Sequence, residues 1–364
     1  MRTLTLSLAL LAACTVKNPG YIPAEGGPPS DLTSDQPASD SDLGPRTDAR
    51  PESQLPPQKP KGVDVLIVVD DSPGMSYGQA WLARDIEALT AALDALPGGP
   101  SYRVGVVSTD LGVGTFANSN CSASGDAGKL LLRPVCPVPS GGVKYVQRVG
   151  SALNVSGTVK DAIGCMVQLG QDGCGFEQPL EAMRVALTAN TSFLRPDAAL
   201  AVIFLTNEDD CSAKSAALYD PGDTALGPYS SYRCFQYGVL CSGQKPPLEP
   251  TVLQACKPGG TWLWEVKPRY VDFLRGLKPQ GWLSVLVLAA QPLKLTEVAQ
   301  NTYRGNTYYL VKPACTSTSL TGDPAFRLQE LVDQLATQGL FSSICAVSYV
   351  PALKGLATRI QAAF

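Results

Sequence analysis

Four segments of the chain are almost continuously apolar, and they lie at residues 63–69, 102–108, 199–206 and 282–289. A strand that is covered on both faces shows such a run, whereas a strand with one solvent face alternates apolar and polar positions. The pattern therefore predicts four central strands of a mostly parallel sheet.

Between these segments, apolar residues recur at the three- and four-residue steps of amphipathic helices. These periods lie at residues 82–96, 180–187, 270–277 and 353–360. Pro179 and Pro268 stand where the first turn of a helix accepts proline. Strands that alternate with helices predict the α/β fold class, with a doubly wound, mostly parallel sheet flanked by helices. Any binding site is expected at the carboxyl ends of the strands.

Two stretches, residues 118–145 and 211–262, interrupt the alternation and are rich in Gly, Pro, Ser and Cys. We expect them to be loop insertions stapled by disulfides within a folded domain at 61–364. The spacing leaves the connectivity open, but proximity along the chain favours five pairs: Cys121–Cys136, Cys165–Cys174, Cys211–Cys234, Cys241–Cys256 and Cys315–Cys345. Zinc is the alternative for clustered cysteines, and the absence of any CxxC spacing disfavours it.

The first 60 residues differ in composition from the rest of the chain. Residues 1–13 have the basic start and short apolar run of a signal peptide. The tetrapeptide LAAC that ends at Cys14 resembles the bacterial lipobox, which implies cleavage before Cys14 and acylation of its thiol. Residues 14–60 contain ten prolines and few large apolar side chains, so we expect a disordered tether. An ordinary secretory signal is the alternative.

Composition removes several classes of function. The 364 residues include no histidine, which excludes Ser-His-Asp and Cys-His catalysis and the usual zinc sites. The formal charge of −3 gives no electrostatic reason to expect a nucleic-acid partner. Setting Cys14 apart leaves an even ten cysteines, which suits disulfides in an oxidising compartment. We expect a lipid-anchored protein of the bacterial cell envelope, and the resemblance to bacterial lipoproteins, with Thr15 and not Asp after the cysteine, implies the outer membrane.

One group of polar residues follows the predicted strands. The first strand ends at Val69 and is followed by Asp70-Asp71-Ser72-Pro73-Gly74, and the third ends at Thr206 and is followed by Asn207-Glu208-Asp209-Asp210. Carboxylate, hydroxyl and amide oxygens at adjacent strand ends are suitable ligands for Ca²⁺ or Mg²⁺. The alternatives are a carboxylate that caps the following helix at Asp70 and a solvated acidic turn at 208–210.

An apolar strand followed by D-x-S resembles the start of the metal-ion-dependent adhesion site of the von Willebrand factor A family. The second loop of that family resembles residues 173–179, where Glu177 replaces the usual threonine, and Asn207 replaces the usual aspartate of the third loop. Gly74 stands where the second serine belongs. The resemblance implies that the ion, Ca²⁺ or Mg²⁺, binds weakly through Asp70, Ser72, Glu177, Asn207 and Asp209.

The resemblance also implies a function. We expect a binding protein, not an enzyme, that meets a protein or cell-surface ligand and reaches the membrane through its lipid anchor. A structural envelope lipoprotein without a ligand is one alternative. A metal-dependent phosphatase with Asp70 as nucleophile is another, but Ser72 occupies the position where that chemistry requires a general acid.

Overall fold

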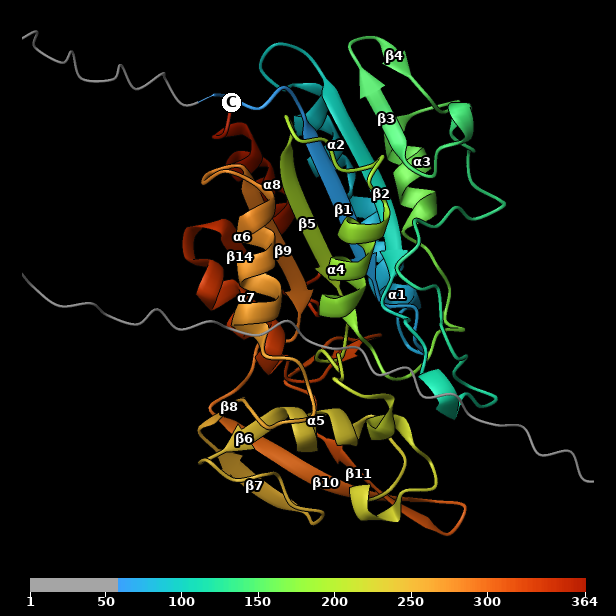
Figure 1. The fold of residues 1–364 in the computed structure, drawn as a ribbon, viewed down its shortest axis with the longest axis vertical. Coiled ribbons are helices and arrows are strands. Elements are labelled where there is room, and N and C mark those ends of the chain that lie inside the picture. The colour runs from blue at the N-terminus through green and yellow to red at the C-terminus, as the bar shows by residue number, and fades with distance from the viewer. Residues whose placement is uncertain (1–57) are drawn as a thin grey trace, which may run out of the picture. The chain divides into compact units, whose positions relative to one another are not determined.

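A seven-stranded sheet forms the centre of the fold, with strand order β14-β9-β5-β1-β2-β3-β4 (Figure 1). The computed structural model describes residues 58–364, so the predictions for residues 1–13, Cys14 and most of the tether lie outside the described residues. Five neighbouring strands are parallel: β14 (Gly339–Ser343), β9 (Leu283–Ala289), β5 (Ala199–Leu205), β1 (Val63–Val69) and β2 (Ser101–Ser108). The predicted fold class and all four apolar strands are confirmed.

The second edge of the sheet is antiparallel. There β3 (Val146–Val149) pairs with β2, and the two-residue strand β4 (Ala152–Leu153) pairs with β3. Strands β3 and β14 contain polar residues, β4 has only two residues, and none of the three has more than one buried position. None of the three carries the continuous apolar run on which the prediction of strands depended, and none was predicted.

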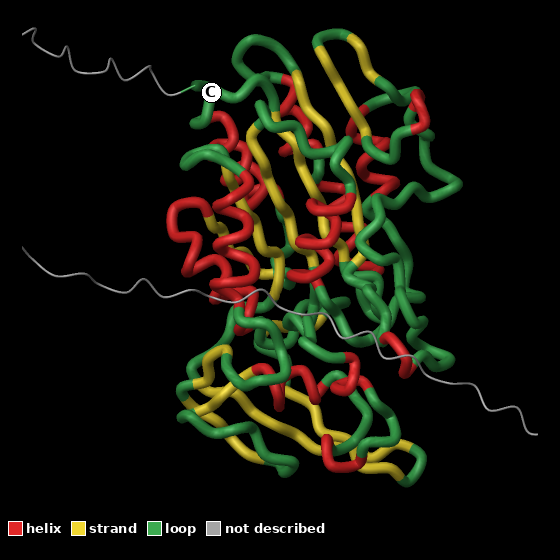
Figure 2. Tube along the Cα trace, in the orientation of Figure 1, coloured by secondary structure: helices red, strands yellow, loops and turns green. Residues whose placement is uncertain are grey.

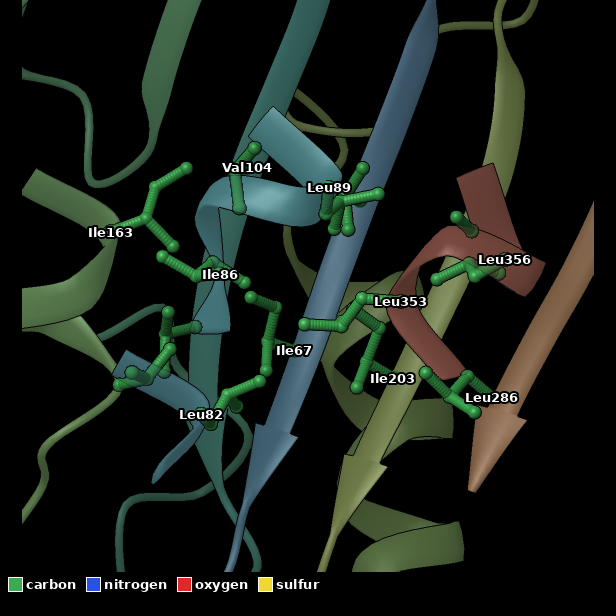
Figure 3. Close-up of a cluster of buried hydrophobic side chains, with 14 of the residues drawn as sticks. Ile67, Leu82, Ile86, Leu89, Val104, Ile163, Ile203, Leu286, Leu353 and Leu356 are labelled. Atoms are coloured by element: carbon green, nitrogen blue, oxygen red, sulfur yellow. The ribbon is translucent and has the colours of Figure 1, made fainter. Parts of the chain in front are cut away.

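Helices cover both faces of the sheet. One layer consists of α1 (Ser76–Asp85), α2 (Glu87–Asp94), α3 (Val159–Met166) and α8 (Val350–Gln361). The other consists of α4 (Pro179–Ala189), α6 (Asp272–Leu277) and α7 (Phe326–Leu335). Alternate residues of β1 pack against the two helical layers. Ile67 belongs to one hydrophobic cluster with Leu82 and Leu353 (Figure 3), and Leu66 belongs to a second hydrophobic cluster with Leu180.

The predicted helical periods are confirmed, with two differences in detail. The period at 82–96 is divided into α1 and α2 at Ile86, which ends the first helix and begins the second while remaining fully buried. Pro179 lies in the first turn of α4, as expected. Pro268 lies in the first turn of a π-helix, Lys267–Val271, that leads directly into α6.

Of the segments predicted as insertions, residues 211–262 lie at the carboxyl ends of the parallel strands, whereas residues 118–145 begin there and run along the β3 side of the sheet towards β4 (Figure 1). Between β2 and β3 the chain is mostly loop and turn (Figure 2), with short 3₁₀ helices at Gly114–Phe116 and Ser140–Gly142. Residues 211–262 contain two further 3₁₀ turns, a helix and three short strands. These elements are Ala216–Tyr219, Thr224–Leu226, α5 (Tyr232–Gly238), β6 (Val239–Cys241), β7 (Thr251–Gln254) and β8 (Cys256–Pro258).

A third insertion, which the sequence analysis missed, follows β9. It contains β10 (Leu295–Tyr303), β11 (Asn306–Val311), β12 (Cys315–Thr316) and β13 (Thr321–Gly322). Strand β10 pairs with β11 on one side and with β7 of the earlier insertion on the other. Tyr232 and Phe235 of α5 share a small apolar cluster with Val298 and Val311 of this sheet. The insertions therefore have a hydrophobic core of their own.

All ten cysteines from Cys121 to Cys345 form disulfides, and three of the expected pairs are confirmed: Cys211–Cys234, Cys241–Cys256 and Cys315–Cys345. The other two expected pairs, Cys121–Cys136 and Cys165–Cys174, are wrong. The bonds join Cys121 to Cys174 and Cys136 to Cys165. Cys165 lies in α3 and Cys174 in the loop after it, and each is bonded to a different part of the long β2–β3 segment.

Among residues 58–364, no helix has the length and apolarity needed to cross a membrane.

Candidate functional site

The carboxyl ends of β1, β2 and β5 meet at one edge of the sheet, and the side chain of Asp70 lies at their centre. Asp70 follows β1 and is fully buried. Its Oδ1 accepts a hydrogen bond from the Ser72 amide at 2.8 Å, and its Oδ2 accepts one from the Thr206 hydroxyl at 2.8 Å. The Asn207 amide approaches the same Oδ2 at 3.4 Å. Asp70 therefore ties the ends of β1 and β5 together.

Asp70 and its partners Ser72, Thr206 and Asn207 form the strand-end cluster. Glu177 joins this cluster from the loop between α3 and α4. Its side chain is 1 % exposed, and its Oε2 accepts a hydrogen bond from the hydroxyl of Thr109, the residue after β2. The Cys121–Cys174 disulfide and a bond from the Gln178 amide to the Thr109 carbonyl (3.1 Å) hold the loop against the end of β2. Sequence proximity alone cannot place Glu177 beside Asp70, because 106 residues separate them.

Four buried oxygens in this cluster have no hydrogen-bond partner. They are Asp71 Oδ1, Ser72 Oγ, Glu177 Oε1 and Asn207 Oδ1. Only two other buried side-chain polar atoms in residues 58–364 lack one. A buried polar atom without a partner is costly, so a concentration of four calls for a physical account. Oxygens of these kinds accept protons or bind a hard cation.

The carboxyls of the cluster repel one another. Burial raises the pKa of Asp70 above its usual range, against the effect of the hydrogen bonds from Ser72 and Thr206. Burial and the charge of Asp70 raise the pKa of Asp71 to about 7. Burial and the same charge raise the pKa of Glu177 well above its usual range. Within residues 58–364, burial and like charges dominate these shifts and no basic group is among their main causes, so either protons or a cation must neutralise the cluster at neutral pH.

The turn after β1 explains why glycine replaces serine at position 74. Gly74 has a φ of +104°, a conformation that a residue with a side chain rarely adopts. The Gly74 amide donates to Gln171 Oε1 at 2.8 Å, which connects this turn to the loop that carries Glu177. The serine hydroxyl expected from the resemblance is thus replaced by a turn whose backbone conformation favours glycine.

The three consecutive carboxylates after β5 have separate environments. Asp209 accepts hydrogen bonds from the Arg327 amide (3.0 Å to each oxygen) and the Leu328 amide (3.3 Å), so it caps the start of α7. Asp210 forms a buried ion pair with the Arg327 side chain at 3.0 Å. Of the five residues expected to bind a metal, Asp70, Ser72, Glu177 and Asn207 gather in the cluster, whereas Asp209 is engaged by α7.

Glu208 instead lines a small cavity of about 60 Å³, between the end of β5 and the insertions. Asp323, Tyr232, Phe235 and Tyr309 also line it. Burial and the charge of Asp323 raise the pKa of Glu208 well above its usual range, and burial raises the pKa of Asp323 to about 7. Buried acidic side chains with raised pKa values therefore extend from the strand ends into the insertions.

The sequence analysis did not assign Thr206 or Gln79 to the site. Thr206 bonds to Asp70, and Gln79 of α1 donates from Nε2 to the carbonyls of Asp70 and Gly170, both at 2.8 Å. The position of Thr206 at the carboxyl end of a predicted strand was an available signal, but Gln79 carried none. In residues 58–364 no three acidic or cysteine side chains are close enough to hold a metal ion by themselves. Any site here must include hydroxyl or amide oxygens.

Comparison with known proteins assigns no family. No family model matches the chain, and no curated protein matches it. Among solved structures, the chain is similar to the pilus adhesin SpaC from Lactobacillus rhamnosus GG in its open conformation, with 11 % identity and a TM-score of 0.35. The similarity covers 84 % of this chain and spans only 30 % of the adhesin. The resemblance to the von Willebrand factor A family remains a prediction.

Proposed function

We propose that this chain is a binding protein of the bacterial cell envelope, and that its strand-end cluster binds a divalent cation and a protein or surface ligand. The observation that carries the proposal is the group of four buried oxygens without partners beside Asp70. A cation would satisfy these oxygens and neutralise the mutual repulsion of the carboxyls. The residues that would hold it are Asp70, Ser72, Glu177 and Asn207, with Asp71 beside them.

The same contacts favour binding over phosphotransfer. A nucleophilic carboxylate needs an oxygen that can reach a substrate, but both oxygens of Asp70 accept hydrogen bonds and the residue is fully buried. In the described residues, 58–364, no lysine or arginine is among the main influences on the carboxyls of Asp70, Asp71 and Glu177, so these residues supply no cation there to stabilise a transferring phosphate. These features support a cation-assisted binding face.

Thermal melts in EDTA and in 10 mM Ca²⁺, Mg²⁺ or Mn²⁺ test the cation. With neutral oxygens replacing charged ones, the dissociation constant should be about 1 mM, which gives about 1.4 kcal/mol and a rise in Tm of about 2–4 °C. Ser72→Ala and Glu177→Gln should each reduce that rise, whereas Asp272→Asn, an exposed control on α6, should keep it. No rise in the wild type with any of the three ions would contradict the cation.

The variant Glu177→Gln also separates a cation site from a merely structural carboxylate. In EDTA it should melt no lower than the wild type, because it removes a buried charge and keeps an oxygen for Thr109. A structural carboxylate would make the variant less stable under every condition. Loss of stability that is equal with and without cation would therefore count against the proposed ligand role.

We further propose that Cys14 is lipidated and anchors the protein to the outer membrane. Five disulfides support an extracytoplasmic location, since such bonds persist in oxidising compartments. Cys14→Ala should move the protein from the membrane fraction to the soluble fraction. Sedimentation of the variant with membranes in high salt would contradict the lipid anchor.

A further inference from the structure

A second pocket lies at the opposite end of the sheet, where β9 begins and where α6, α7 and α8 end (Figure 1). Its volume is about 640 Å³, which is enough for a small organic molecule. Leu283 and Leu335 form part of its wall, and both are almost completely buried. This pocket is independent of the strand-end cluster and of the function proposed for it.

Three cationic side chains line the pocket, and no carboxylate does. They are Arg275 of α6, Lys278 immediately after α6, and Arg359 in the last turn of α8. None of the three takes part in any of the eleven ion pairs found within residues 58–364. A chain with a net charge of −3 thus gathers three unpaired cations around one pocket.

Each cation donates to a single backbone carbonyl. Arg275 Nη2 donates to Gln334 O at 2.7 Å, Arg359 Nη1 donates to Gly339 O at 2.6 Å, and Lys278 Nζ donates to Arg195 O. A guanidinium has five N–H donors and an ammonium has three. Most donors around the pocket therefore have no acceptor within the described part of the chain.

The ends of the helices account for only part of this charge. Three helix C-termini together present about −1.5 elementary charges, which basic side chains commonly neutralise. The three side chains carry three positive charges, so about 1.5 positive charges remain after the helix ends are neutralised. Lys278 is only 6 % exposed, and burial lowers the pKa values of both Lys278 and Arg359. The charges of Asp64 and Asp197 partly offset this effect at Lys278, whereas burial alone acts on Arg359. A partly buried guanidinium without an ion-pair partner is costly, which favours an anion beside Arg359.

We propose that this pocket binds a phosphate group, carried either by a small soluble molecule or by a lipid headgroup. Phosphate offers several acceptor oxygens and two negative charges, and arginine recognises it through two parallel hydrogen bonds. Ser284 and Thr337, which also line the pocket, supply hydroxyls. The apolar wall formed by Leu283 and Leu335 leaves room for the organic part of such a ligand.

The test uses the full chain carrying Cys14→Ala, so that no lipid anchor contributes to binding. Its Tm is measured in 10 mM inorganic phosphate, in 10 mM glycerol phosphate and in sodium chloride of equal ionic strength. Either phosphate should raise the Tm by about 2–4 °C over chloride. Arg275→Gln should at least halve that rise, and Arg275→Gln with Arg359→Gln should abolish it. Lys354→Gln, an exposed control on α8, should leave it unchanged.

Sedimentation with vesicles of phosphatidylglycerol or phosphatidylcholine distinguishes the two sources of phosphate. Binding to phosphatidylglycerol alone, lost in Arg275→Gln, would identify a lipid headgroup. A Tm rise in free phosphate without vesicle binding would identify a soluble ligand. Arg275 is exposed, so its variant should fold even if the Arg359 variant does not. The proposal is overturned if neither form of phosphate binds, or if the arginine variants bind as the wild type does.

Discussion

Replacing Arg327 with methionine tests how the insertions are fixed to the sheet. Arg327 is 2 % exposed and lies in the first turn of α7. Its Nε donates to Asp210 at 3.0 Å and its Nη2 donates to the carbonyl of Trp264 at 2.6 Å, so one side chain joins α7, the loop after β5 and the segment that directly follows the second insertion. Asp210 also accepts the Leu180 amide at the start of α4.

The expected loss of stability follows from what the substitution leaves behind. Methionine fills much of the volume but abandons a carboxylate that is 1 % exposed, and removal of one partner of a buried ion pair costs about 3–5 kcal/mol. Loss of the bond to Trp264 adds about 1 kcal/mol. In the double variant with Asp210→Asn, the abandoned charge is gone. That variant should recover about 1–2 kcal/mol relative to Arg327→Met alone.

Urea denaturation with the disulfides intact, followed by circular dichroism, measures both variants. The control is Lys267→Met, which removes the ion pair between Lys267 and Asp272, whose side chains are 54 % and 48 % exposed. An exposed pair contributes about 1 kcal/mol or less. The reasoning is refuted if Arg327→Met loses less than about 1 kcal/mol, or if the double variant is less stable than the single one.

Two further predictions concern pH and connectivity. Burial raises the pKa of Asp323 to about 7, so between pH 4 and 7 the native state holds a proton that the unfolded chain has lost, and stability falls as pH rises through this range. In EDTA at pH 8, Asp323→Asn should be more stable than the wild type by on the order of 1–2 kcal/mol, with no difference near pH 4; equal melting curves at both pH values would contradict this. Non-reducing peptide maps should contain the pairs Cys121–Cys174 and Cys136–Cys165. A peptide joining Cys121 to Cys136, or alkylation of two or more of the ten cysteines, would show that this connectivity is wrong.

The central strands were predictable because burial on both faces leaves a direct mark on the sequence. All seven residues of β1, β5 and β9 are buried. The insertion after β9 leaves no such mark, because only Thr296 and Val298 of the nine residues of β10 are buried. Its pairing with β7 is also a contact between distant segments, which periodicity within one segment cannot reveal.

The candidate site was predictable in part for the same reason. Parallel strands end at one edge, so Asp70 and Asn207 could be expected together from the strands that precede them. The different environments of Glu208, Asp209 and Asp210 could not, because three successive carboxylates look alike until the helix that Asp209 caps is in place. The exchanged disulfide partners of Cys121 and Cys165 show the same limit, since distance along the chain is a poor guide within long loops.

The pairing of β7 with β10 bears on how the molecule can be taken apart. These two strands flank α6 and β9 in the sequence, so the small sheet is assembled from segments on either side of a central strand. No continuous stretch of chain contains the small sheet without also containing β9. During synthesis β7 must wait for its partner until β9 has emerged, while the Cys241–Cys256 bond closes a loop of only 15 residues and needs no later segment. The insertions are therefore not a transplantable module: to graft their surface onto another protein, α6 and β9 would have to go with it.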